Sequence, residues 1–419
     1  MTAPVPVGLR LEAPGFPHDE VRRRAVCGVE AVFPCLLNSA PAYGRAVFGE
    51  TPGRGAVALD GIDTMRLVPP VLMPERLEQL IELGREPYYA DVDLSTSIGG
   101  FASSLPVFVS AMGSTATAHS EIGTRLAVQA ARAGIPLVVG ENVCAVHGYD
   151  RRSSLHAPTF KERAFMYVDN LAGGSGGLVV QQSTEDADAE LWNHVYSDPS
   201  FHPLVASGRL AFELKLGQGA KGCSGGITMV DSAAADHLAD RFALEAVNGG
   251  TLLRISAPGT FTQDILRSQV RLIRNNFPDV RVWVKLPPGR DLAVAATTAW
   301  EAGADAVTVD AASGGSGLAP TALLQHLGLP LDACLAQFVD VAGPLLVSGR
   351  MWEGSRAVKA LALGATAVGI GRAALLAVAE EPERGLLNLL AAMALEMQLL
   401  TAALGKYSIA RLGREDLWP

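Results

Sequence analysis

From about residue 105 onward, the chain alternates between short apolar runs and Ala-rich stretches. Each apolar run is rich in β-branched residues, ends in a polar or Gly-rich tip, and is followed by a segment with helical periodicity. This alternation predicts the strands and helices of a parallel sheet. Eight runs are predicted as strands: PVFVSA (106–111), PLVVG (136–140), LAFELKL (210–216), LLRISA (252–257), VWVKL (282–286), AVTVDA (306–311), LLVSG (345–349) and AVGIG (367–371).

The predicted strands are apolar throughout, which indicates strands that are buried on both faces. Eight of them, separated by helices, predict an α/β fold of the (β/α)8 TIM barrel type, with an open doubly wound sheet as the alternative. About seventy residues, 141–209, separate the second predicted strand from the third. So long a connection is usually functional, and we predict a lid there, although GLVVQQ (177–182) could be a ninth strand.

The two ends of the chain differ from the repeating part. Residues 1–64 are predicted as an accessory segment with a helix in HDEVRRRAVCGVEAVF (18–33), and residues 65–419 as the barrel. The last apolar stretch, 382–407, predicts a long amphipathic helix packed on the barrel. Asn388, Glu396 and Gln398 interrupt its apolar sequence, so we do not expect it to span a membrane. The N-terminus has no apolar stretch of signal-peptide length, so we expect a cytoplasmic protein without a membrane partner.

The composition argues against some classes of binding partner. The formal net charge is −9 and the pI is about 5.4, which argues against nucleic acid, because binding phosphates requires clustered basic residues. The basic cluster Arg22-Arg23-Arg24 is interpreted as a solvated helix face. Five cysteines without a CxxC pair suit reduced thiols and give no metal-binding spacing. They are Cys27, Cys35, Cys144, Cys223 and Cys334.

The tips of the last predicted strands are rich in glycine. In a TIM barrel the active site lies at the carboxyl ends of the strands, and phosphates often bind after the seventh and eighth. Glycines allow backbone N–H groups to approach an anion, and a following helix adds positive partial charge. The alternative is that the glycines only permit tight turns. The predicted phosphate cradle comprises Ser348, Gly349, Arg350, Gly369, Gly371 and Arg372, with Asp310, Gly314, Gly315, Ser316 and Gly317 of the sixth strand and its loop.

Charged residues inside apolar strands are a second signal. Lys215 and Lys285 would be costly to bury without an anionic partner. A reduced flavin carries negative charge near N1 and the C2 carbonyl, so it could be that partner. The alternative is a structural ion pair, for example between Lys215 and Glu213. No GxGxxG string follows the first strand, so a mononucleotide fits better than a dinucleotide.

Other polar residues are expected at the mouth of the barrel. Glu141 and Gln218 follow the second and third predicted strands and could contact substrate or move a proton. His119 and His147 lie near the same rim, but a single histidine is more often structural.

These stretches resemble the FMN-binding domain of glutamate synthase and its stand-alone relatives over about residues 65–415. The resemblance is carried by VSAMGS (109–114), LKLGQGAKGCSGG (214–226), VDAASGGSGLAP (309–320) and LALGATAVGIGRA (361–373). It implies FMN as cofactor, with Ser110, Ala111 and Met112 along the flavin ring. Lys215 and Gln218 would touch the ring, Lys285 would lie at its pyrimidine side, and Glu141 would face the substrate. The Gly-rich loops would hold the ribityl phosphate.

The sequence also departs from that family. The family's iron–sulfur cysteines are missing from GRAALLAVAEEPERG (371–385), KPGEGG has become KGCSGG, and the glycine-rich stretch after the Glu141 match has become NVCAVHGYD. We expect no amidotransferase domain. Electrons must therefore be exchanged in another way, so we expect a separate electron donor or acceptor and an activity other than glutamate synthesis.

We therefore expect an FMN-dependent oxidoreductase that moves a hydride between flavin N5 and a carbon bearing an amine, imine or hydroxyl on a small polar metabolite. Three alternatives stay open. An α-hydroxy-acid oxidase would need a histidine that DAASGGSG lacks, and a type 2 isopentenyl diphosphate isomerase would need a pyrophosphate site. A non-catalytic flavin-binding subunit would work beside a partner. The sequence also leaves a homo-oligomer open.

Overall fold

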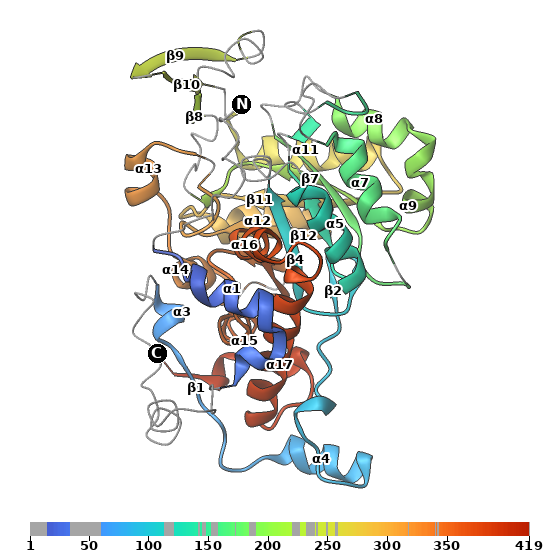
Figure 1. Cartoon of the computed structure of the whole chain (residues 1–419), viewed down its shortest axis with the longest axis vertical. Coiled ribbons are helices and arrows are strands. Elements are labelled where there is room, and N and C mark those ends of the chain that lie inside the picture. Colours follow the sequence, from blue (N-terminus) through green and yellow to red (C-terminus); the bar gives the residue numbers. More distant parts are fainter. Residues whose placement is uncertain are drawn as a thin grey trace.

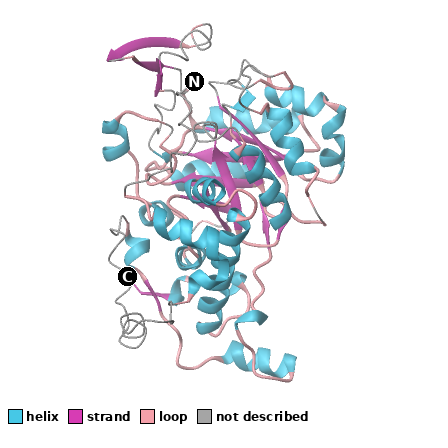
Figure 2. Cartoon of the chain, viewed as in Figure 1, coloured by secondary structure: helices cyan, strands magenta, loops and turns pink. Residues whose placement is uncertain are grey.

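Eight parallel strands form a closed barrel at the centre of the protein (Figures 1 and 2). The computed structural model describes residues 15–33, 60–112, 121–140, 143–144, 148–151, 158–171, 173–183, 190–219, 227–231, 239, 242–248, 250–255, 259–316, 318–339, 341 and 343–418. The barrel strands are β4 (Val107–Met112), β5 (Leu137–Val139), β6 (Leu178–Ser183), β7 (Leu210–Lys215), β11 (Arg281–Leu286), β12 (Ala306–Asp310), β13 (Leu345–Ser348) and β14 (Ala367–Ile370). The predicted (β/α)8 fold is confirmed, and the sheet is closed rather than open.

One predicted barrel strand was wrong, and the segment considered as a ninth strand takes its place in the barrel. LLRISA (252–257) does not enter the barrel. It contributes β10 (Thr251–Ile255) to an antiparallel sheet with β8 (Thr228–Asp231) and β9 (Ala243–Asn248). GLVVQQ, considered as a ninth strand, is instead β6, between β5 and β7. The predicted long connection over 141–209 is therefore two shorter connections on either side of a barrel strand.

Helices surround the barrel, and the main hydrophobic core lies between them and the outward-facing strand residues such as Val109, Val180 and Phe212. The helices that follow or connect barrel strands are α5 (Ile122–Ala133), α7 (Phe160–Val168), α8 (Leu191–Ser197), α9 (His202–Ala206), α11 (Gln263–Asn276), α12 (Leu292–Glu301), α13 (Thr321–His326), α14 (Leu331–Ala336), α15 (Gly354–Ala362) and α16 (Arg372–Glu380). Gly134 ends α5 in a left-handed conformation, φ +68°, which glycine adopts without a Cβ clash.

The amino end of the barrel is closed by a hairpin. Strands β2 (Thr96–Ile98) and β3 (Phe101–Ser103) pair antiparallel, and Ile98 and Phe101 belong to a second, inner cluster of buried apolar residues. The Trp283 indole of β11 donates a hydrogen bond of 3.0 Å to the carbonyl of Gly99 in the hairpin turn. This floor leaves the opposite, carboxyl end of the barrel as the place for a site.

The predicted C-terminal helix is α17 (Gly385–Ala403), and it packs against α1 (His18–Cys27), α15 and α16. It is long and apolar enough to cross a membrane, a property that core helices of globular proteins share. The predicted helix near the N-terminus is confirmed as α1, followed by a 3-10 turn over Gly28–Val32. The remaining described elements are α3 (Gly61–Thr64), β1 (Arg66–Leu67), α4 (Pro74–Leu83), β15 (Leu417–Trp418) and 3-10 turns over Tyr89–Asp91, Pro199–Phe201, Ile409–Arg411 and Arg414–Asp416.

The sequence predicted a solvated face for the basic cluster on α1, but of its three arginines only Arg23 is exposed. Arg22 and Arg24 are each only 5% exposed. Arg24 makes two hydrogen bonds, of 2.9 and 2.6 Å, to the Glu396 carboxylate of α17 and lies over the Trp352 ring. Because buried arginines need acidic partners, these side chains attach α1 to the barrel helices.

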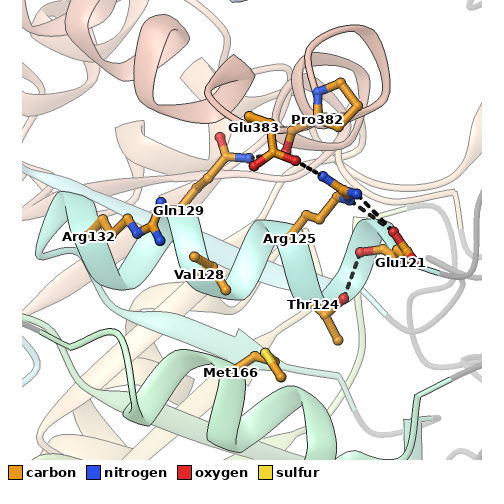
Figure 3. Close-up of a pocket in the computed structure, with 9 residues that line it drawn as sticks. All are labelled: Glu121, Thr124, Arg125, Val128, Gln129, Arg132, Met166, Pro382 and Glu383. Carbon is orange, nitrogen blue, oxygen red and sulfur yellow. Dashed lines mark hydrogen bonds and ion pairs between the residues drawn. The ribbon is translucent and has the colours of Figure 1, made fainter.

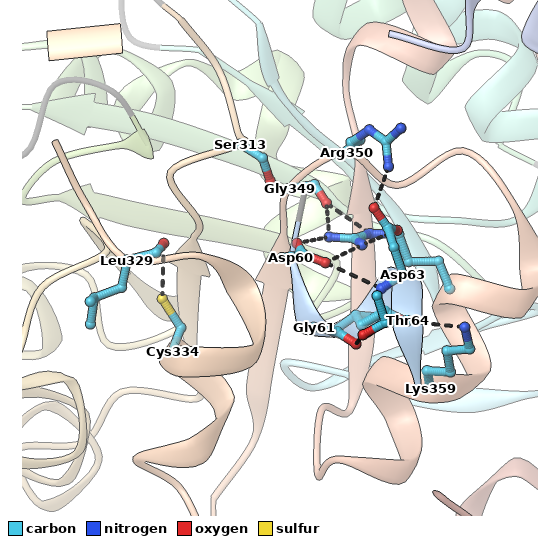
Figure 4. A network of polar contacts seen from close by, with 12 residues as sticks. Asp60, Gly61, Asp63, Thr64, Ser313, Leu329, Cys334, Gly349, Arg350 and Lys359 are labelled. Carbon is cyan, nitrogen blue, oxygen red and sulfur yellow. Dashed lines mark hydrogen bonds and ion pairs between the residues drawn. The ribbon is translucent and has the colours of Figure 1, made fainter. Parts of the chain in front are cut away.

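A second buried ion-pair network attaches α3 to the seventh strand and its helix (Figure 4). The Arg356 guanidinium of α15 contacts both Asp60 oxygens, at 2.5 and 2.7 Å, and Asp63 Oδ1 at 2.7 Å. Asp63 Oδ2 accepts a hydrogen bond of 2.6 Å from Arg350. The side chains of Asp60 and Arg356 are both 1% exposed, so this contact is shielded from solvent.

The network shifts the pKa values of its members. Burial alone would raise the pKa of Asp60, but the hydrogen bonds and charge of Arg356 outweigh it and hold that pKa below its usual value. For the same reason the pKa of Arg356 is raised although burial opposes the charged form. A carboxylate whose pKa is lower in the folded state stabilises the fold above its unfolded pKa and loses that contribution as pH falls.

We therefore predict that the substitution Asp60→Asn lowers the free energy of unfolding by roughly 3 kcal/mol near neutral pH, because it removes one partner of a buried ion pair. The difference from wild type should shrink as pH falls below about 4, where Asp60 of the unfolded wild-type chain begins to take up a proton, and continue to shrink toward the lower pKa of the folded protein. Urea unfolding across this pH range measures it. Asp264→Asn, at an exposed pair with Arg267, is the control. A deficit for Asp60→Asn that does not change with pH would contradict the interpretation.

Candidate active site

The interior of the barrel changes from apolar to polar along the strands. Alternate strand residues point to the same face, so the residues two positions after the inner apolar cluster also point inward. At the amino end the inner residues include Phe108, Val179, Ala211 and Trp283. Toward the carboxyl end the inward positions are Ser110 on β4, Gln181 and Ser183 on β6, Glu213 and Lys215 on β7, Lys285 on β11, Thr308 and Asp310 on β12, and Ser348 on β13. Polar groups therefore collect under the mouth.

Asp310 is at the centre of this polar layer and is only 3% exposed. Its Oδ1 accepts a hydrogen bond of 2.6 Å from the Ser348 hydroxyl. Its Oδ2 accepts one of 3.2 Å from the backbone N–H of Gly219 and lies 3.4 Å from the Lys285 ammonium. One carboxylate thus joins the carboxyl ends of β11, β12 and β13 to the loop after β7.

The carboxyl ends of β4 and β14 lie close together because no side chain separates them. A Cβ on Gly369 would lie 2.3 Å from the Ser110 hydroxyl, so these strands can approach only because residue 369 is glycine. A Cβ on Gly371 would be 4.0 Å from Met112 Sδ and from Ser110 Cβ, which leaves room there. The Ser110 hydroxyl is buried and has no hydrogen-bond partner among the described residues. A buried hydroxyl normally has a partner, so this one is suited to a ligand.

The tips of β12, β13 and β14 form the adjoining part of the mouth. A Cβ on Gly349 would lie 3.1 Å from the Ser313 hydroxyl, and that hydroxyl too is buried and lacks a described partner. Arg372, the first residue of α16, donates to the Ser313 carbonyl and lies 4.9 Å from the centre of the Phe16 ring. Gly371 precedes α16 without a side-chain cap, which leaves the helix N-terminus available to an anion.

The two predicted lysines, Lys215 and Lys285, lie inside barrel strands near the carboxyl ends of β7 and β11. Lys215 and Lys285 pair in register on β7 and β11, and both are buried. Lys285 faces Asp310, which was predicted as a cofactor contact rather than as its partner. Glu213 accepts hydrogen bonds from Gln181 and Thr308, at 2.5 and 3.0 Å.

Other predicted site residues have fewer contacts with this polar layer, or lie outside the residues that the structure describes. Gln218 is half-buried one residue before Gly219, and Ala111 is half-buried beside Ser110. Gly314 packs against the Asp310 carboxylate, whereas Gly315 and Ser316 are exposed. Arg350 points to Asp63 rather than standing free in the cradle. Glu141, Gly317, His119, His147, Cys223 and Ser224 lie outside the described residues.

Sequence reasoning missed the layer of Gln181 and Thr308 that surrounds Glu213. The signal was present, because polar residues at alternate positions of an otherwise apolar strand mark the barrel interior. It also missed the contacts of Asp60 and Asp63 with Arg356, which comes nearly 300 residues later in the chain. No local pattern connects such residues.

The described part of the chain holds a pocket away from the mouth and no group of residues suited to a metal ion. No group of His, Cys, Asp and Glu there could hold a metal ion. A pocket of about 240 Å³ lies outside the barrel, against α5, α7 and the turn before α17 (Figure 3). Its Arg125 is already paired with Glu121 and Glu383. We therefore place the candidate site in the mouth.

Comparisons with known proteins identify the family. A family model described as the conserved region in glutamate synthase matches residues 174–384, which is half of the chain. The chain belongs to the glutamate synthase family. The archaeal-type glutamate synthase [NADPH] of Dehalococcoides mccartyi is 31% identical over 183 residues, covering 41% of this chain and 36% of that protein. The glutamate synthase large subunit-like protein of Rhizobium meliloti is 28% identical over 222 residues, covering 49% and 48%.

These matches span less than half the length of either relative.

Solved structures confirm the fold at lower identity. (S)-mandelate dehydrogenase from Pseudomonas putida aligns with a TM-score of 0.54 and 18% identity, over 96% of this chain and 99% of the other. A mandelate oxidase with a monooxide FMN adduct aligns with a TM-score of 0.52 and 18% identity, over 85% and 88%. Glutamate synthase family membership, together with this barrel, supports an oxidoreductase.

In this member of the glutamate synthase family, we predict that Asp310→Asn destabilises the fold by roughly 3 kcal/mol, because a buried ammonium loses the carboxylate that faces it. Ser348→Ala removes one hydrogen bond to that carboxylate but keeps the ion pair, and should cost about 1.5 kcal/mol. Urea unfolding of both variants and wild type measures the order. Equal losses would contradict a main contribution from the pair between Asp310 and Lys285.

Proposed function

We propose that the protein is an FMN-dependent oxidoreductase that transfers a hydride between the cofactor and a carbon bearing an amine, imine or hydroxyl on a small polar metabolite. The observation that carries this proposal is the glycine-lined cradle between the last strands. There, two buried hydroxyls, of Ser110 and Ser313, lack described partners beside the N-terminus of α16. Family membership supports a flavin, and the barrel supports its position at the carboxyl ends of the strands.

The residues of the cradle suit a phosphate monoester. Gly371 leaves open space, the α16 N-terminus carries positive partial charge, and Arg372 adds a cation at the same point. Ser313 can donate a hydrogen bond to the phosphate, which would satisfy its buried hydroxyl. FMN ends in such a phosphate, so these residues would hold its ribityl phosphate.

The polar interior suits the other end of the cofactor. When bound, FMN supplies an electron-accepting ring whose N5 exchanges a hydride with substrate. The ring would lie along Ser110, Ala111 and Met112, where β4 ends. Lys215 and Lys285 pair in register at this level of the barrel, and we assign to them the positive charge that stabilises the electron-rich pyrimidine side. Lys285 also contacts Asp310 and, through it, positions Ser348 and Gly219.

Substrate would enter from the open side of the mouth. Gln218, half-buried after β7, is a candidate for binding a polar group, and Glu141 stays a predicted contact and proton carrier. The antiparallel sheet of β8, β9 and β10 is inserted between β7 and β11, and the Met229 N–H donates a 3.0 Å hydrogen bond to the Leu318 carbonyl after β12. We propose this insertion, rather than residues 141–209, as the element that excludes water.

The test begins with the absorbance spectrum of the purified protein and the mass of the released chromophore. We expect the bands of oxidised flavin and the mass of FMN. Anaerobic addition of NADPH, followed by a panel of small amino and hydroxy acids and their oxidised forms, should bleach and restore the flavin bands with at least one pair. Flavin that binds but exchanges electrons with none of them would favour the non-catalytic flavin-binding subunit instead.

A variant in the cradle makes the same test site-specific. Gly371→Ala should leave the stability of the flavin-free protein unchanged, because the new methyl group meets no atom closer than 4.0 Å. It should weaken FMN binding by about tenfold or more, since the methyl occupies the space assigned to the phosphate. Gly174→Ala, at an open position before β6, is the control. Unchanged FMN affinity in Gly371→Ala would place the phosphate elsewhere.

A further inference from the structure

The ion-pair network of α3 ends on a backbone atom of the cradle. Arg356 donates two further hydrogen bonds, from Nε at 3.3 Å and from Nη2 at 3.2 Å, to the carbonyl of Gly349 (Figure 4). Its remaining contacts are to Asp60 and Asp63. The guanidinium therefore connects two carboxylates of the N-terminal segment to the peptide that follows β13. We call Asp60, Asp63 and Arg356 the strut.

This peptide needs external support. Gly349 has φ +146° and Arg350 has φ +55°, a conformation that residues with a Cβ rarely adopt and that costs about 1 kcal/mol or more. Arg350 is 5% exposed and is held by Asp63 at 2.6 Å. Ser348, just before the turn, is fixed from inside the barrel by Asp310. The turn is thus fixed by Asp310 on one side and by the strut on the other.

The strut also determines the direction of one backbone donor. The described peptide bonds are trans, so the N–H of Arg350 points opposite to the carbonyl of Gly349. With that carbonyl turned onto Arg356, the N–H of Arg350 is directed away from α15. Backbone N–H groups in glycine-containing turns are the usual donors to phosphate oxygens.

We propose that Asp63 and Arg356 are positioning residues, which orient the peptide between Gly349 and Arg350 so that its N–H binds the phosphate of the cofactor. This inference rests on the proposed function, because it assumes a phosphate in the cradle. It adds that a segment nearly 300 residues earlier in the chain sets the affinity for the phosphate group. The strut itself does not touch the flavin ring.

The experiment compares the binding of FMN and of riboflavin, which has the same ring and ribityl chain but no phosphate. Flavin-free full-length protein is titrated with each ligand, and quenching of flavin fluorescence gives the two dissociation constants. In wild type FMN should bind more tightly than riboflavin. In Asp63→Asn, FMN binding should weaken by about tenfold, the effect of losing one hydrogen bond to a charged group, whereas riboflavin binding should not change.

Two further variants separate positioning from general stability. Arg356→Lys keeps the charge but cannot contact Asp60, Asp63 and the Gly349 carbonyl together, so it should also lower FMN affinity selectively. Asp416→Asn removes another buried carboxylate, which pairs with Lys406 at 2.7 Å in a 3-10 turn that contacts α15. It should lower the unfolding temperature without changing the ratio of FMN to riboflavin affinity.

The outcomes distinguish the two claims. If Asp63→Asn and Arg356→Lys weaken FMN and riboflavin equally, or weaken neither, the strut does not position a phosphate donor and the inference is overturned while the flavin site stands. If wild-type protein binds neither ligand, the proposed function fails, and the inference fails with it. Selective loss of FMN affinity in both strut variants, and not in Asp416→Asn, supports the inference.

Discussion

The buried carboxylate of Asp310 holds the mouth of this barrel together. Parallel strands in a closed barrel are connected by backbone hydrogen bonds, but the loops beyond their carboxyl ends need other contacts. Asp310 supplies these contacts by binding Lys285, Ser348 and the backbone of Gly219 from three different segments. Because a buried charge is costly without partners, the Asp310 position constrains all three at once.

Contacts from two sides fix the end of the seventh barrel strand, β13. From inside, Asp310 fixes Ser348, and from outside Arg356, anchored by Asp60 and Asp63, fixes the carbonyl of Gly349. Backbone donors bind an anion strongly only when they are already oriented, because orientation then costs nothing on binding. The arrangement therefore supports a preformed cradle, and two buried hydroxyls without described partners lie beside it.

The fold was largely predictable, because eight apolar runs separated by helical segments leave few alternatives to a barrel. The errors have a physical cause. β6 carries Gln181 and Ser183 on its inward face, and a strand with polar inward residues is harder to recognise than an apolar one. LLRISA (252–257) has the composition of a barrel strand, and composition does not reveal that its partners are antiparallel neighbours.

The candidate site was predictable in its outline only. Glycines at strand tips and lysines within strands can be read locally, and the structure brings Gly349, Gly369 and Gly371 to the same mouth. The pairing of Lys285 with Asp310 depends on which strands are neighbours, and the strut depends on residues at opposite ends of the chain. Such contacts arise from tertiary packing, which local sequence patterns do not contain.

We propose that the mouth binds FMN with its phosphate between the tips of the last two strands. A crystal structure of the protein crystallised with FMN tests it most directly. We expect electron density for the phosphate within hydrogen-bonding distance of the backbone at Gly371 and Arg350 and of the Ser313 hydroxyl, with the ring along β4. Density for the flavin outside the barrel mouth, or a phosphate pointing away from these residues, would contradict it.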